Sequence, residues 1–206
     1  MSSRHKHLTV LGVVLAAALM CAVALAATMQ TYSQKFTVKH PAQATAMTLR
    51  WSARATGGAA PKQPKTVTVT FPNKMFIDTF AVGANAKIGS GTATFSSSPP
   101  RAVTVRSAGP GGIALVITNP VGTSVTMNVP YAHMGAQMVL NIPKFSHPRT
   151  VLTGLSLTIK AGSAKRPYLK TPPTCPTGGW KFSAAFVYPA GTPTQVLSST
   201  SACVKH

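Results

Sequence analysis

Apolar and polar residues alternate along several short runs of the chain. Successive side chains of a β-strand point to opposite faces, so a period of two predicts strands with one buried and one exposed face. The clearest runs are TVTVTFP (66–72), SVTMNVP (124–130), QMVLNIP (137–143) and LSLTIK (155–160). Glycine, proline and asparagine separate such runs at intervals of about 8–12 residues, a spacing typical of sandwiches and barrels. The pattern therefore predicts an all-β fold, an antiparallel β-sandwich of immunoglobulin-like character.

Two runs depart from simple alternation. GIALVITNP (112–120) is apolar at nearly every position from Ile113 to Ile117, which predicts a central strand covered on both faces. KIGSGTATF (87–95) places two glycines near Lys87, as a phosphate-binding loop would. That motif needs four residues between its glycines and a following Gly-Lys-Ser/Thr and helix, whereas TATF is typical of a strand. We interpret the glycines as a bulge or tight turn that enters a strand.

The C-terminal part of the chain predicts a hairpin closed by a disulfide. Its outgoing strand turns five residues to one face: Trp180, Phe182, Ala184, Phe186 and Tyr188. PAGTP (189–193) supplies the turn, and residues 194–203 form the return strand. Cys175 stands before the first strand and Cys203 ends the second, so a bridge between them would close the open ends of the hairpin.

Residues 1–27 have the layout of a secretory signal peptide. Arg4 and Lys6 precede an apolar run that ends in small residues, and we expect cleavage after Ala26, with Ala24 as the alternative. An uncleaved N-terminal anchor stays open, because the apolar run is long enough to span a bilayer. We divide the chain into a signal peptide helix (1–26) and a single β-sandwich domain (27–206). Within that domain, 55–65 is a loop or linker and the strands predicted at about 32–54 join the main sandwich.

Charge is the most unusual feature of the composition. The chain has 20 lysines and arginines against one acidic residue, Asp78; removal of Arg4 and Lys6 would leave 18 against one, a formal charge of +17. Intramolecular ion pairs cannot neutralise such a surface, so the sequence predicts an external polyanion as partner. The candidates are an anionic cell-wall polymer, an anionic lipid surface or, non-specifically, extracellular nucleic acid. The densest basic group predicts the contact surface: Lys160, Lys165, Arg166, Tyr168 and Lys170.

The residue inventory argues against most enzymatic chemistry. A single carboxylate excludes catalysis by paired carboxylates, and the scattered histidines and lack of carboxylate or thiolate clusters disfavour a metal site. We therefore predict no catalytic, cofactor-binding or metal-binding residues and no small-molecule substrate. The rival hypothesis is a hydrolase that uses a serine with His133 or His147 and no carboxylate dyad. A third is a membrane-anchored accessory domain.

Several motifs resemble a group of exported actinobacterial proteins of unassigned function. They are VTVTFPNKMFIDTFAV (67–82), IGSGTATF (88–95), VLTGLSLTI (151–159) and the terminal segment from Thr171 to Cys203. The resemblance covers most of residues 66–203 and implies an exported protein with a final CP…W-x-F-x-A-x-F-x-Y…C hairpin. It implies no enzymatic activity. The chain departs from this group by lacking a cysteine pair ahead of IGSGTA. The sequence thus predicts a secreted or cell-envelope, non-enzymatic protein that binds anionic polymers or surfaces.

Overall fold

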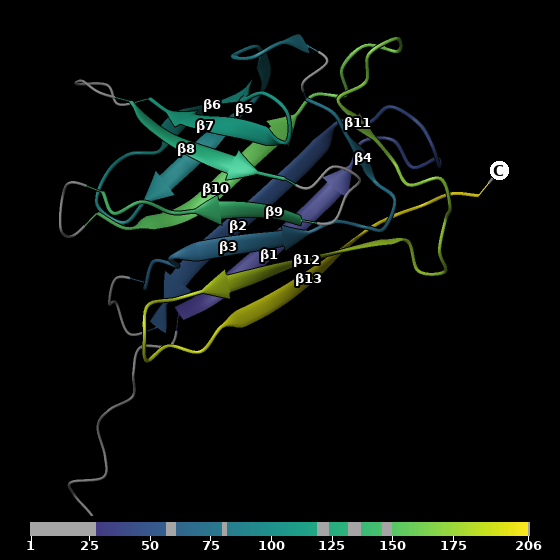
Figure 1. The fold of residues 1–206 in the computed structure, drawn as a ribbon. Coiled ribbons are helices and arrows are strands. Elements are labelled where there is room, and N and C mark those ends of the chain that lie inside the picture. Colours follow the sequence, from purple (N-terminus) through teal and green to yellow (C-terminus); the bar gives the residue numbers. More distant parts are fainter. Residues whose placement is uncertain are drawn as a thin grey trace, which may run out of the picture.

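The computed structural model describes residues 28–56, 61–79, 82–118, 124–131, 137–145 and 150–205, and its strands form three antiparallel sheets (Figure 1). The largest sheet has the strand order β1-β2-β10-β5-β6-β7-β8. Its strands are β1 (Thr28–Phe36), β2 (Met47–Ala55), β5 (Lys87–Phe95), β6 (Arg101–Ser107), β7 (Gly112–Ile117), β8 (Val125–Pro130) and β10 (Leu152–Ile159). The predicted all-β, antiparallel fold is confirmed.

The smaller sheets complete the architecture. Four strands follow the order β13-β12-β3-β9: β3 (Thr66–Thr70), β9 (Gln137–Asn141), β12 (Trp180–Val187) and β13 (Gln195–Ser201). A third sheet pairs β4 (Phe76–Ile77) with β11 (Leu169–Lys170). No helix in the described part of the chain has the length and apolar character needed to cross a bilayer. The predicted signal peptide lies outside the described residues.

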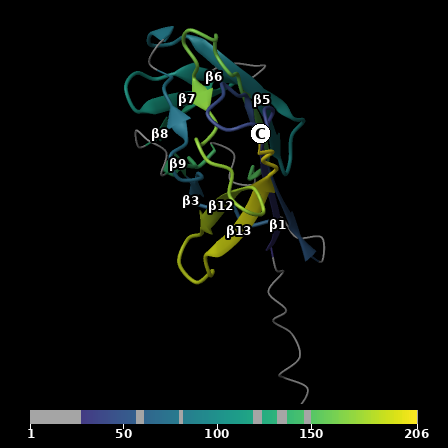
Figure 2. The ribbon, with the colours of Figure 1, turned by 90° about the vertical axis from the view of Figure 1, so that its right-hand side faces the viewer.

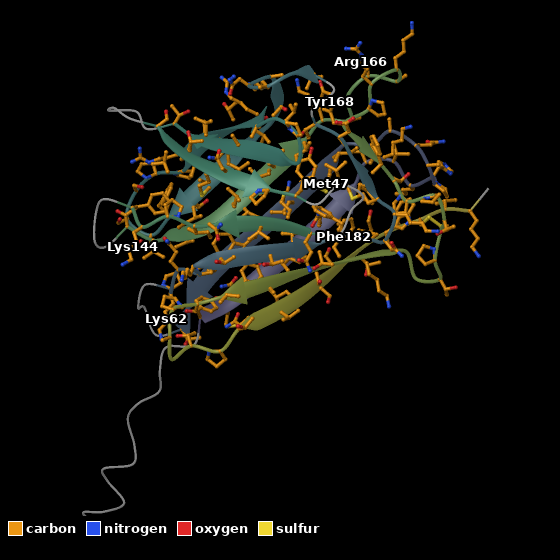
Figure 3. The ribbon with its side chains drawn as sticks, viewed as in Figure 1. Met47, Lys62, Lys144, Arg166, Tyr168 and Phe182 are labelled. Atoms are coloured by element: carbon orange, nitrogen blue, oxygen red, sulfur yellow. A yellow bond between two sulfur atoms is a disulfide. The ribbon has the colours of Figure 1, made fainter. Side chains whose placement is uncertain are left out.

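The core lies between the seven-stranded and four-stranded sheets, as the alternating runs predict. Phe182 of β12 packs edge-on against Phe36 of β1, with ring centroids 5.1 Å apart, and Trp51 of β2 meets Phe186 of β12. Met47 and Phe182 come from different sheets, and both are buried in the same hydrophobic core (Figure 3). All five inward residues of the predicted terminal strand are buried. Burial of about 25 cal/mol per Å² of apolar surface between these layers is the main stabilising term.

The prediction for GIALVITNP is only partly right. Residues 112–117 form β7, and Ala114 on its outer face is buried, but Val116 is half-exposed. Val116 is half-exposed because β7 lies next to the edge strand β8. Its outer face is covered only by the side chains of neighbouring strands.

The edges of the two main sheets approach each other on both sides. On one side, β13 binds β1 through side chains: the Gln34 and Phe36 amides donate to the hydroxyls of Ser199 and Ser201, at 2.9 and 3.0 Å. Figure 2 shows β13 and β1 as neighbours. On the other side, β8 leads into β9 through a bridge between Tyr131 and Met138. Because these contacts satisfy part of each edge, less of the backbone is left open to pairing with other chains.

The predicted disulfide is confirmed. Cys175 and Cys203 are bonded, with their Cα atoms 5.6 Å apart, at the open ends of the β12–β13 hairpin. The amide of Val204 then donates to the carbonyl of Lys39 at 2.8 Å. The C-terminal tail is therefore fixed to the loop that joins β1 and β2.

Two buried tyrosines give a matched prediction for polar groups in the core. The Tyr131 hydroxyl lies 2.7 Å from the Thr79 hydroxyl, whereas the buried Tyr188 hydroxyl has no partner among the described residues. Burial also raises the pKa of Tyr188 to about 12. Tyr131→Phe should lower the free energy of unfolding by about 1–2 kcal/mol, whereas Tyr188→Phe should leave it unchanged or slightly higher. Urea unfolding of both variants tests this, and an equal loss in Tyr188→Phe would contradict the assignment.

Candidate binding groove

The outer face of the seven-stranded sheet carries a groove of about 950 Å³ that crosses β1, β2, β10 and β5. We call it the arginine groove. Its floor is a row of paired residues, one from each strand: Thr31, Ser52, Gly154 and Thr94. Neighbouring strands lie about 4.8 Å apart, so a row of four spans roughly 14 Å. The groove is long enough for an extended ligand that runs across the strands.

Two arginines stand on either side of this floor. Arg50 and Arg54 both lie on β2, two residues before and two after Ser52, and both are exposed. Alternate residues of a strand share a face, so both guanidinium groups belong to the same side as the Ser52 hydroxyl, with each Cα about 7 Å from that of Ser52. Ser33 and Ser156, the neighbours of Arg50 across the sheet, are short and leave its side chain free to reach over the floor.

A β-bulge shapes the centre of the groove. The register between β10 and β5 shifts from Leu152 opposite Phe95 to Gly154 opposite Thr94, so Thr153 is the extra residue. The Thr153 hydroxyl donates to the Thr94 carbonyl at 3.2 Å. Gly154 has no side chain, and the floor is lowest at this point. Bulges often bend a strand or re-aim a side chain beside a binding site, and this one has that position.

The groove is electrostatically positive and rich in hydroxyl groups. The described residues that line it include Arg50, Arg54 and a set of serines and threonines, with no carboxylate among them. The Thr31 and Ser52 hydroxyls bind each other at 2.7 Å, which leaves one hydroxyl proton and several lone pairs for a ligand. The aromatic residues at this level point inward: Trp51 is buried, and the Tyr32 phenol donates to the Gln34 amide oxygen while its burial raises its pKa.

The predicted contact residues Lys160, Lys165, Arg166, Tyr168 and Lys170 come together in a separate feature, which we call the basic hairpin (160–170). A bridge joins Gly162 to Pro167, and the Arg166 amide donates to the Ser163 carbonyl at 3.1 Å to close the tip. Arg166 lies at the tip and Tyr168 at the base (Figure 3). The Lys170 ammonium lies 5.6 Å from the Phe76 ring centroid, a cation–π contact.

The basic hairpin and the arginine groove lie along the same strand. Lys160 directly follows β10, four residues beyond Ser156 of the groove, which is about 13 Å in an extended strand. At the other end of the molecule, Lys62 and Lys144 lie far from Arg166 (Figure 3). Both are exposed, and Lys62 follows Pro61 of the groove lining. Lys160 therefore continues the positive charge beyond one end of the groove, and Lys62 lies next to its Pro61 lining, with its ammonium donating to the Thr192 hydroxyl at 3.0 Å.

The other candidate chemistry leaves no assembled site in the described residues. Asp78 follows β4, and its amide donates to the Tyr168 carbonyl at 2.8 Å, so it lies at the base of the basic hairpin. His133, His147 and His206 lie outside the described residues, and so the rival hydrolase arrangement is not described. No three metal-binding side chains gather in the described part of the chain. KIGSGTATF is strand β5, with a register shift between Lys87 and Gly89, which confirms its interpretation as a bulged strand.

No family model matches the chain, and no curated protein is significantly similar to it. The candidate site therefore depends on its own geometry. The density of charge along the sequence pointed to residues 160–170 and not to Arg50 and Arg54. The stronger signal was the alternation in MTLRWSARA (47–55), which turns Arg50, Ser52 and Arg54 to one face of a strand.

Proposed function

We propose that the protein is an exported, non-enzymatic binding protein that holds an anionic polymer in the arginine groove, in the cell envelope or outside the cell. The observation that carries the proposal is the pair of exposed arginines around a hydroxyl floor, in a groove whose described lining has no carboxylate. Guanidinium groups bind carboxylate and phosphate oxygens through paired hydrogen bonds, and hydroxyl groups complete the contacts. The basic hairpin is a second, peripheral contact for the same polymer.

Further observations support this proposal. The disulfide is consistent with an oxidising compartment, as the N-terminal signal pattern also predicts. The four-strand extent of the groove suits a chain-like ligand better than a single small anion. The proposal also includes three predictions from the sequence. They are the immunoglobulin-like character of the sandwich, the cleavage of the signal peptide and the relationship to exported actinobacterial proteins.

Retention on a dextran sulfate resin in a salt gradient tests the groove. Arg50→Gln/Arg54→Gln should elute at clearly lower salt than the wild type, and the slope of log affinity against log salt should fall by about 1.5, because each lost ionic contact removes about 0.7–0.9. Lys165→Gln/Arg166→Gln, at the tip of the basic hairpin, should produce a smaller change.

The matched control is Lys181→Gln/Lys205→Gln, which removes the same charge from exposed positions outside both features. If the three double variants elute at the same salt concentration, only net charge matters and the groove is not the site. If retention of the wild-type protein does not depend on the salt concentration, the proposed binding of anionic polymers is wrong.

A further inference from the structure

We infer that the ligand of the arginine groove is a polyol phosphodiester polymer, with a phosphate between Arg50 and Arg54 and polyol hydroxyls on the floor. This inference rests on the proposed function and specifies its substrate class. It follows from three properties of the groove: the arrangement of its charges, the chemistry of its floor and the absence of an exposed aromatic platform in its described lining.

The charges favour anions that repeat along a chain. The Cα atoms of Arg50 and Arg54 are four strand residues apart, about 13 Å, and both side chains are long enough to reach a shared anion above Ser52 or two successive anions. A phosphodiester offers two unesterified oxygens and a full negative charge at neutral pH, which matches the fork of an arginine. Arginine is also suited to this role because it is more weakly hydrated than lysine.

The floor favours hydroxyl groups beside those anions. Thr31, Ser52 and Thr94 present side-chain hydroxyls; all three can accept a hydrogen bond, and Thr94 and one of the bonded Thr31–Ser52 pair can also donate one. Gly154 has no Cβ atom and so leaves the floor open at its centre; a Cβ atom there would lie 3.2 Å from the Trp51 carbonyl oxygen and 3.4 Å from the Thr94 Cβ. A linear polyol phosphate has a hydroxyl or a phosphate oxygen at almost every carbon, so its surface matches this floor.

The same floor disfavours the other polyanions. Single-stranded nucleic acids gain affinity by stacking bases on aromatic side chains, and uronate polymers present the apolar faces of rigid sugar rings. Trp51 is buried, and Tyr32, its partner across the sheet, packs against the core, so both rings lie on the inner face of the sheet and offer no stacking face to the groove. A nucleic acid or a uronate polymer would therefore be held mainly by charge.

The test is binding of the purified protein to a synthetic glycerol phosphate oligomer, measured by calorimetry at fixed ionic strength. Single-stranded DNA, oligogalacturonate and sulfated dextran of equal charge are the comparison ligands. The glycerol phosphate oligomer should bind at least about fivefold more tightly than any of these. Ser52→Ala/Thr94→Val keeps the charge and removes two floor hydroxyls, and should weaken the glycerol phosphate complex about fivefold to tenfold, as expected for two neutral hydrogen bonds.

The comparison variant is Thr68→Val/Ser183→Ala, which makes the same chemical change on the outer face of the four-stranded sheet and should have no effect. Equal affinity for all four ligands, or no loss in Ser52→Ala/Thr94→Val, would overturn the phosphodiester assignment but leave the proposed function intact. If Arg50→Gln/Arg54→Gln binds every ligand as tightly as the wild type, both the phosphodiester assignment and the proposed function are wrong. Phosphatidylglycerol vesicles carry the same phosphate chemistry, and tighter binding to them than to the oligomer would assign the groove to lipid headgroups instead of a polymer.

Discussion

Gly91→Ala should destabilise the protein by about 3 kcal/mol or more, although it adds a single methyl group. Gly91 lies in β5 opposite Leu157 of β10, and a Cβ atom on it would lie 2.0 Å from the Ser156 carbonyl oxygen and 2.8 Å from a Leu157 methyl carbon. The first of these neighbours is backbone and cannot rotate away. The methyl group would therefore force β5 and β10 apart in the middle of the seven-stranded sheet.

Gly112→Ala is the matched control. Gly112 opens β7, and a Cβ atom on it would make only ordinary contacts, at 3.6 Å from the Ala108 Cβ and 3.8 Å from the Val129 carbonyl oxygen. We expect its free energy of unfolding to stay within about 0.5 kcal/mol of wild type. Urea unfolding midpoints, with the slopes compared, measure both variants. A Gly91→Ala variant as stable as Gly112→Ala would show that β5 and β10 are not as close as described.

The glycines of IGSGTATF show which features of the fold the sequence can predict and which it cannot. The sequence alone predicted a bulge or tight turn that enters a strand, because TATF is typical of a strand, and the structure has strand β5 with a register shift between Lys87 and Gly89. It did not predict the partner. β10 begins more than fifty residues later, and no local pattern says that its backbone passes against Gly89 and Gly91. Close approach of a distant strand, and not a local turn, is the reason that these positions are glycines.

The candidate site was predictable to a lesser extent than the fold, for the same reason. Each strand of the groove showed which of its residues face outward, because that depends only on a period of two. The groove itself is a row across strands, and it brings Ser52 of β2 beside Gly154 of β10, about a hundred residues away in the chain. Charge density along the sequence instead indicated the basic hairpin, whose residues are neighbours in the chain. The density of charge along the sequence can indicate a basic hairpin. A groove that crosses several strands can be predicted only when the order of the strands in the sheet is known.

Loss of the disulfide should have the other large effect on stability. Cys175→Ala/Cys203→Ala should lower the free energy of unfolding by about 3.5 kcal/mol in the chain-entropy account of a loop of this length, whose ends are 28 residues apart. Thermal unfolding with and without reductant measures it. Reduction should lower the midpoint of the wild type and have no further effect on the double variant, while Cys21→Ser should behave as wild type. An unchanged midpoint on reduction of the wild type would contradict the prediction.

The position of the disulfide predicts which part of the fold is destabilised first when the bond is removed. Ser199 and Ser201 of β13 accept the amides of Gln34 and Phe36, so the strand that the disulfide secures also covers the β1 edge of the larger sheet. Without the bond, β13 should fray from its Ser201 end and release these two amides together. Hydrogen exchange of Gln34 and Phe36 should then accelerate in the double variant more than that of β6, which lies in the interior of the same sheet. Uniform acceleration across all strands would instead mean that the disulfide stabilises the fold only globally, without a special role at the edge between the two sheets.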